Sequence, residues 1–205
     1  MKKIVLIGAS GLIGKAVADL LEPDHDVVGV GHSKGSHTVA LGSFASIEAL
    51  FKKVGPCDAV ICAAGLSRFA KLTEATEDDF VFSLNHKLMG QVNLARIAQE
   101  YVRPNGSITI TTGLLAREPW PGTVPTATVN AGLEGFVRAA ALDLENGVRI
   151  NAVSPILVTE TAENLGLPVG GSMSAQETAK AYKVSLEGDM TGQVLDVRDH
   201  GSVHP

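Results

Sequence analysis

A glycine-rich loop at residues 8–14, Gly8-Ala9-Ser10-Gly11-Leu12-Ile13-Gly14, constrains the possible fold more than any other segment. It follows a continuous apolar run at residues 4–7, typical of a buried parallel strand, and it opens a stretch with helical periodicity at residues 12–21. Glycines at this place allow a tight turn and a close approach of phosphate to backbone. Free N–H groups of the first helical turn then bind a pyrophosphate. We therefore expect dinucleotide contacts from Gly8, Ser10, Gly11, Leu12, Ile13 and Gly14.

Short strand-like runs alternate with longer helical stretches through the rest of the chain. Strands are expected at residues 26–30, 59–62, 107–112, 148–153 and 193–197, and helices at residues 46–54, 77–102, 125–145 and 175–187. This alternation predicts a single α/β domain over residues 1–197, with a three-layer, doubly wound parallel sheet of the Rossmann type. Residues 198–205 have the composition of a polar C-terminal tail.

Composition narrows the classes of partner. The chain has a net charge of −5, whereas most nucleic-acid-binding chains have an excess of basic residues. We therefore expect a small-molecule substrate and no nucleic-acid partner. Cys57 and Cys62 do not form a C-x-x-C pair, and no metal site is expected. The apolar run at residues 4–7 is too short for a signal peptide or a membrane span. These observations favour a cytoplasmic protein without a membrane partner.

The segment after the second expected strand bears on the choice of cofactor. An acidic residue about twenty positions after the glycine loop usually binds the ribose 2′-hydroxyl of NAD. This chain has no carboxylate there and instead has His32, Ser33 and Lys34, which can hold a 2′-phosphate. The residues therefore favour NADP, with NAD the less favoured cofactor. The alternative is a solvated basic loop that contacts no ligand.

Several segments together resemble the short-chain dehydrogenase/reductase superfamily. Cys62-Ala63-Ala64-Gly65 is similar to its Asn-Asn-Ala-Gly motif, residues 84–90 are similar to the helix that carries its active-site asparagine, and residues 108–112 are similar to its catalytic serine strand. Residues 133–136 and 149–155 are similar to stretches that flank its active site. The resemblance implies catalytic roles for Asn85 and Thr112. It also implies cofactor contacts from Ala63, Ala64, Gly65, Asn130 and Pro155.

The same resemblance shows a departure at the catalytic pair. The family has Tyr-x-x-x-Lys just before the segment at residues 133–136, and Thr126 and Asn130 occupy these two positions here. The pKa of a threonine hydroxyl is several units higher than that of a tyrosine hydroxyl, so threonine cannot serve as a proton reservoir near neutral pH. Asn130 can still bind a ribose hydroxyl, but it has no charge. Losing general acid–base help costs about 10²- to 10⁴-fold in rate, which slows hydride transfer without preventing it.

Other side chains are candidates for replacement chemistry. His86 is a candidate acid, weighed against a surface or interface histidine. Arg68 is a candidate ligand for an acidic substrate or a phosphate, and Trp120 is a candidate substrate platform or a cover over the core.

We expect an NADP-dependent oxidoreductase with a non-standard active site that acts on a small carbonyl substrate. A catalytically inactive NADP-binding sensor or regulatory protein is the alternative, and an isomerase or lyase is a third. The resemblance also implies a homodimer or homotetramer that packs through the expected helices at residues 77–102 and 125–145.

Overall fold

The computed structural model describes residues 1–204 and contains one parallel sheet of seven strands in the order β3-β2-β1-β4-β5-β6-β7. The strands are β1 (Lys3–Ile7), β2 (Asp26–Gly31), β3 (His37–Thr38), β4 (Cys57–Cys62), β5 (Val102–Thr111), β6 (Arg149–Ser154) and β7 (Val194–Asp196). The order reverses direction between β1 and β4, whose register pairs Ile4 with Ala59 and Ile7 with Cys62. In open α/β sheets this switch point leaves a crevice at the carboxyl ends of the strands.

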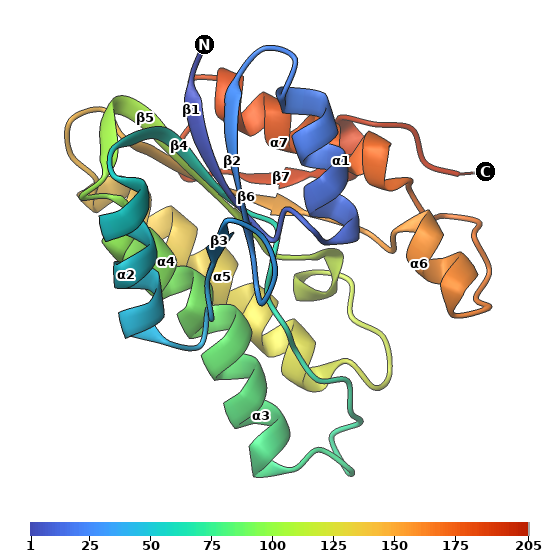
Figure 1. The fold of residues 1–205 in the computed structure, drawn as a ribbon. Helices are drawn as coiled ribbons and strands as arrows, with labels where there is room; N and C mark the ends of the chain where they lie inside the picture. The colour runs from blue at the N-terminus through green and yellow to red at the C-terminus, as the bar shows by residue number, and fades with distance from the viewer. Residues whose placement is uncertain (205) are drawn as a thin grey trace.

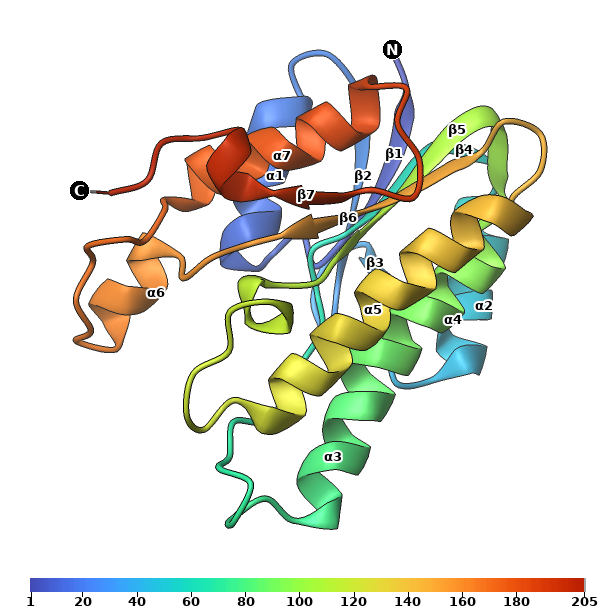
Figure 2. The same cartoon turned by 180° about the vertical axis from the view of Figure 1, so that it is seen from behind.

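Helices cover both faces of the sheet, as Figures 1 and 2 show from opposite sides. One face carries α1 (Leu12–Leu21) and α7 (Ala175–Glu187), and the other carries α2 (Phe44–Val54), α4 (Met89–Ala98) and α5 (Val124–Asp143). Two shorter helices, α3 (Glu77–Ser83) and α6 (Thr159–Asn164), extend past the carboxyl edge of the sheet. The expected doubly wound, three-layer Rossmann fold is therefore confirmed.

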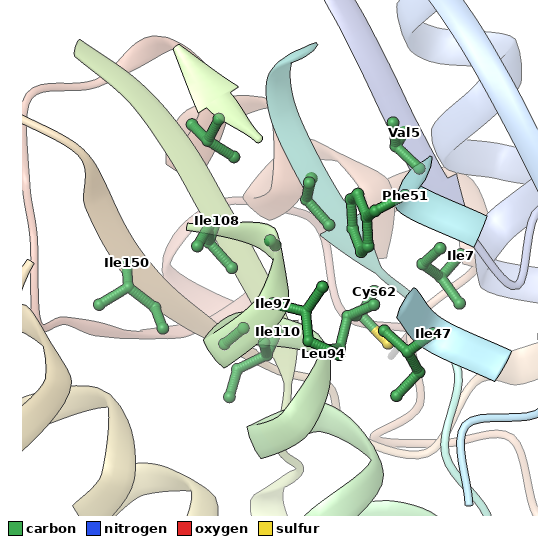
Figure 3. Close-up of a cluster of buried hydrophobic side chains, with 14 of the residues drawn as sticks. Val5, Ile7, Ile47, Phe51, Cys62, Leu94, Ile97, Ile108, Ile110 and Ile150 are labelled. Atoms are coloured by element: carbon green, nitrogen blue, oxygen red, sulfur yellow. The ribbon is translucent and has the colours of Figure 1, made fainter. Parts of the chain in front are cut away.

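The core consists of two apolar layers, one on each side of the sheet. Along β1 the side chains of Ile4 and Leu6 join the layer under α1 and α7, while those of Val5 and Ile7 join the layer under α2 and α4. Figure 3 shows the second layer, where Phe51 and Leu94 lie over the strands and Cys62 lies between Leu94 and Ile47. Continuous apolar strands of this kind are typical of sheets that are buried on both faces.

The expected helix at residues 77–102 is wrong as a single element. It divides into α3, a π-helical turn at Leu84–Leu88 and α4, and it ends at Ala98. The N–H of Met89 donates to the carbonyl of Leu84, five residues earlier, so the turn holds one residue more than an α-helical turn. Val102 is not helical; it begins β5, where it pairs with Cys57 and is buried.

Smaller differences concern the ends of elements. Helix α5 ends at Asp143 before the expected residue 145, and Ser43 caps α2 through the N–H of Ser46. Strand β3 and helix α6 were not expected, because each is too short to show periodicity. None of the helices within residues 1–204 is long and apolar enough to cross a membrane.

Candidate active site

The glycine loop forms a tight turn between β1 and α1. Gly8 has a positive φ of +84°, and its N–H donates to the carbonyl of Val30 at 2.8 Å. A Cβ atom on Gly14 would overlap the carbonyl oxygen of Gly8, and one on Gly8 would lie 2.9 Å from Cβ of Ala64. Glycine is therefore required at both positions. The helix begins at Leu12 with Gly11 as its N-cap, so the first N–H groups of α1 are left for a ligand.

A cleft of about 680 Å³ lies over this loop at the carboxyl edge of the sheet. Gly8, Ser10 and Gly11 form part of its wall, together with Ala63, Ala64 and Gly65 after β4. His32 lines the cleft after β2, while Ser33 and Lys34 are exposed beside it. The sequence-predicted cofactor residues from these three segments thus lie around one cleft.

A second cavity of about 480 Å³ shares the wall at Ala63, Ala64, Gly65 and Leu66 with the first. Its polar lining includes Lys87, Thr112, Thr126 and Asn130. Its apolar lining includes Ile13, Leu114, Leu115, Trp120, Pro155, Ile156, Leu157 and Val158. The two spaces together form a continuous groove along the strand ends. An extended dinucleotide needs a groove of this form. Leu12 is exposed on α1 and Gly14 is buried beneath the loop, so neither lines either space.

Thr112 and Asn130 contact each other in the second cavity. The hydroxyl of Thr112 donates to the backbone carbonyl of Asn130 at 2.9 Å, and both residues are almost fully buried. Among the described residues, Oδ1 of Asn130 has no hydrogen-bond partner. A buried acceptor without a donor is costly, so this atom fits a ligand hydroxyl, such as one on the ribose of a nicotinamide cofactor.

Thr126 lies in the same cavity, but its hydroxyl is engaged. Its Oγ1 lies 2.8 Å from the carbonyl oxygen of Arg68 and 2.9 Å from Oγ of Ser67. The side chain therefore holds the loop after β4 against the start of α5.

Asn85 is not brought to the cavity that contains Thr112. It is exposed and lies in an outer groove with Arg68 and Phe82, where the Arg68 guanidinium is 4.2 Å from the centre of the Phe82 ring. His86 lies at the first cleft beside Gly42, and its ring is tilted by 35° against that of Phe82, with ring centroids 4.4 Å apart. Neither side chain reaches the second cavity, although Trp120, which is half exposed, does line it.

Lys87 and Gln91 are site residues that the sequence reasoning missed. Nζ of Lys87 donates to the carbonyl of Thr112 at 3.1 Å, and a Cβ on Gly65 would lie 3.0 Å from Cγ of Lys87. Burial lowers the pKa of Lys87 to about 8, against the opposing effect of Cys62. The Gln91 amide pairs with both the N–H and the carbonyl of Thr111 at 2.8 Å. No local pattern in the sequence marks either residue, because their positions depend on contacts with the end of β5.

The remaining buried titratable groups lie behind the cavity wall. The hydroxyl of Tyr182 bonds Oγ1 of Thr111 at 2.7 Å, and burial raises its pKa well above the usual range. Burial also raises the pKa of Cys62 to about 12 and that of Cys57 to about 11. All three groups are neutral near pH 7 and contribute packing and hydrogen bonds.

A doubly wound parallel sheet with a glycine loop and a groove at its switch point defines a Rossmann-type nucleotide-binding protein. Residues 42–197 match a family model described as Enoyl-(Acyl carrier protein) reductase. The chain therefore belongs to the short-chain dehydrogenase/reductase superfamily of oxidoreductases, which bind a nicotinamide cofactor.

Curated relatives and solved structures agree with this assignment. Carbonyl reductase family member 4 of Danio rerio is 26% identical over 222 residues, covering 93% of this chain and 94% of the relative. Hydroxynaphthalene reductase arp2 of Aspergillus fumigatus is 33% identical over 117 residues, covering 54% of this chain but only 42% of the relative.

Two solved structures cover nearly the whole fold. The protein lin1944 from Listeria innocua has a TM-score of 0.92 and 34% identity, over 96% of this chain and 100% of that chain. A small-chain dehydrogenase in complex with NADPH has a TM-score of 0.85 and 27% identity, over 95% of each chain.

Proposed function

We propose that this chain is an NADP-dependent oxidoreductase that interconverts a small, apolar carbonyl compound and its alcohol in the second cavity. The observation that carries the proposal is Asn130, which lines the second cavity beside Thr112 and has a buried Oδ1 without a partner among residues 1–204. In this proposal residues 1–197 form the cofactor-binding domain. The cofactor contacts in this proposal are Gly8, Ser10, Gly11, Ile13, Ala63, Ala64, Gly65, Asn130 and Pro155, which line the two spaces.

The choice of NADP rests on the residues that follow β2. His32, Ser33 and Lys34 supply donors and positive charge where a carboxylate would repel a 2′-phosphate. The complex of a structurally similar dehydrogenase with NADPH is consistent with this choice.

The proposed site departs from the Tyr-x-x-x-Lys arrangement of the family. Thr126 and Asn130 occupy the two positions, and the Thr126 hydroxyl is held by the loop at Ser67 and Arg68. When bound, the nicotinamide ring supplies or accepts a hydride. Asn130 orients the ribose through Oδ1, and the apolar walls exclude water from the space beside Thr112.

The substrate class follows from the cavity lining. Leu66, Phe69, Leu114 and Trp120 surround the space, and Lys87 is its charged lining residue. A neutral ketone or aldehyde with an apolar substituent suits these walls, because the substituent would be removed from water against apolar side chains.

A catalytically inactive NADP-binding sensor is the second candidate. The engaged hydroxyl of Thr126 favours it, since no tyrosine within residues 1–204 lines the cavity.

An NADPH titration followed by a carbonyl reduction assay distinguishes the oxidoreductase from the inactive sensor. Trp120 is the single tryptophan of the chain and lines the second cavity, so its fluorescence should fall when NADPH binds. We expect NADPH to bind more tightly than NADH, and NADPH absorbance to decay with 4-nitrobenzaldehyde or 9,10-phenanthrenequinone. NADPH binding without turnover of either compound would support the sensor. Equal or tighter binding of NADH would overturn the NADP assignment.

We also propose a homodimer or homotetramer that packs through α4 and α5, which carry part of the expected helices at residues 77–102 and 125–145. A shallow hollow of about 230 Å³ between these helices is lined by Ala95, Phe136, Ala139 and Ala140, small or apolar side chains that permit close packing. Sedimentation equilibrium should give two or four chains per particle at micromolar concentration, and a monomer would contradict the proposal.

A further inference from the structure

We propose that the ammonium group of Lys87 is the proton donor to the carbonyl oxygen in this site, and so replaces the family's tyrosine from a different helix. The inference rests on the proposed function and names the residue that performs its proton transfer. Lys87 lines the second cavity together with Thr112, Thr126 and Asn130.

The position of Lys87 is fixed by three local features. The π-helical turn at Leu84–Leu88 turns its side chain toward the strand ends, where Nζ bonds the carbonyl of Thr112 at 3.1 Å. Its methylenes lie across Gly65, and a side chain on Gly65 would push them away. One turn further along, Gln91 clamps the backbone of Thr111 and so holds α4 against the end of β5. An ammonium has three N–H donors, so two remain after the bond to Thr112.

The electrostatic surroundings suit a proton donor. Among the described residues, the titratable group whose charge acts on Lys87 is the Cys62 thiol of β4, which is itself neutral near pH 7. Tyr182 of α7 faces Thr111 from behind the wall, and His86 of the same turn lies at the first cleft. No carboxylate in the described chain forms an ion pair with Lys87. Burial therefore outweighs the opposing effect of Cys62, and the lowered Lys87 pKa of about 8 makes proton release favourable near neutral pH.

The hydroxyl groups of Thr126 and Thr112 are less well placed to donate a proton to the carbonyl oxygen. The same holds for the His86 imidazole, which lies at the first cleft. The Thr126 hydroxyl is held by Ser67 and Arg68, and the Thr112 hydroxyl donates to the carbonyl of Asn130. Both are aliphatic alcohols, whose protons are not available near neutral pH.

The carbonyl group receives one hydride and one proton in this step. The carbonyl carbon gains the hydride of the reduced cofactor, which becomes NADP⁺, and the C–O π electrons move to oxygen. That oxygen takes one proton from Nζ of Lys87. Lys87 becomes a neutral amine and is reprotonated from solvent, so the net reaction consumes one NADPH and one proton per alcohol formed.

Substitutions at Lys87 test the inference through activity. Lys87→Met keeps the length of the side chain and should lower kcat for 4-nitrobenzaldehyde by about 10²-fold or more, with NADPH affinity within about twofold. Lys87→Arg should lose the activity as well, because a guanidinium does not release its proton at the assay pH. Lys87→Ala should regain turnover in proportion to added ethylammonium. Lys52→Met, at an exposed lysine of α2, is the matched control and should leave kcat unchanged.

A titration of the lysine itself gives a readout that does not depend on turnover. In protein labelled with ¹³C at the lysine ε-carbon, the signal absent from Lys87→Met belongs to Lys87. It should titrate near pH 8, whereas the signals of exposed lysines should titrate near pH 10.5. A merely structural lysine would show no rescue by ethylammonium and no loss of kcat above its own pKa.

The outcomes separate the two proposals. If the parent protein binds NADPH and reduces the aldehyde while Lys87→Met does so equally fast, the Lys87 inference is overturned and the proposed function stands. The inference also fails if Lys87 titrates near pH 10.5, or if the kcat of the parent does not fall as pH rises through about 8. Absence of NADPH binding or turnover in the parent would overturn the proposed function and this inference with it.

Discussion

Gly14 lies so close to the carbonyl oxygen of Gly8 that one added methyl group would overlap that oxygen. Gly14→Ala should therefore displace the loop from the end of β1, weaken NADPH binding about tenfold or more and lower the melting temperature. Fluorescence titration through Trp120 and a thermal melt measure the two effects. Gly135→Ala in α5 is the matched control, since its Cβ would meet no atom within 4 Å. That control should be stabilised by about 0.5–1 kcal/mol, and an equal loss of binding in both variants would refute the loop assignment.

Asn130→Leu should weaken NADPH binding and leave the stability of the fold almost unchanged. Oδ1 of Asn130 has no partner in the structure, so its removal should cost little stability and can even raise it. NADPH affinity should fall about 2- to 10-fold, the value of one hydrogen bond to a ribose hydroxyl. Isothermal titration calorimetry and urea unfolding check the two parts. Unchanged NADPH affinity would show that this atom does not bind the cofactor.

The sequence predicted the fold well because long buried strands and the glycine loop carry local signals. Helices α1 and α7 have the expected bounds, and the parallel, doubly wound sheet follows from the alternation of strand and helix. Strand β3 and helix α6 were missed, because their two and six residues are too few to show a period.

The polar centre of the site was harder to predict. A continuous helix puts Asn85 at the place that the family's asparagine would take, but the backbone forms a π turn and Lys87 lines the cavity instead. No spacing rule in the sequence marks such a turn. The half-buried position of Lys87 and the clamp by Gln91 depend on contacts with β5, which a local pattern cannot show.

Gln91→Met should destabilise the protein strongly. The Gln91 amide is fully buried and satisfies both the N–H and the carbonyl of Thr111, so its loss leaves two backbone groups without partners. Each unsatisfied group costs about 1–3 kcal/mol, so we expect a total of about 2–6 kcal/mol from urea unfolding. Gln99→Met, at an exposed position just after α4, should change stability by less than about 0.5 kcal/mol. Similar losses in the two variants would contradict this role for Gln91.

The stability of the parent relative to Lys87→Met should depend on pH in a defined window. The pKa of Lys87 is about 8 in the folded protein and 10.5 for an unperturbed lysine. Between these values the unfolded chain binds more protons, so the parent gains stability as pH rises. The cost of burying the ammonium is fully present below about pH 8. Urea unfolding of both proteins at about pH 7 and about pH 9.5 should show the difference moving in favour of the parent, and a constant difference would contradict a buried ammonium.

The extra residue in the π-helical turn makes the site sensitive to insertion and deletion as well as to substitution. Lys87 lies four positions before Gln91, which fixes α4 to the end of β5. Loss of the single codon for Leu88 would shorten the turn to an ordinary α-helical one and move His86 to the position four before Gln91. The His86 imidazole would then face the cavity in place of the Lys87 amine, although no residue that lines the cavity had been substituted. A change of one residue in the length of this turn would therefore change which side chain faces the cavity.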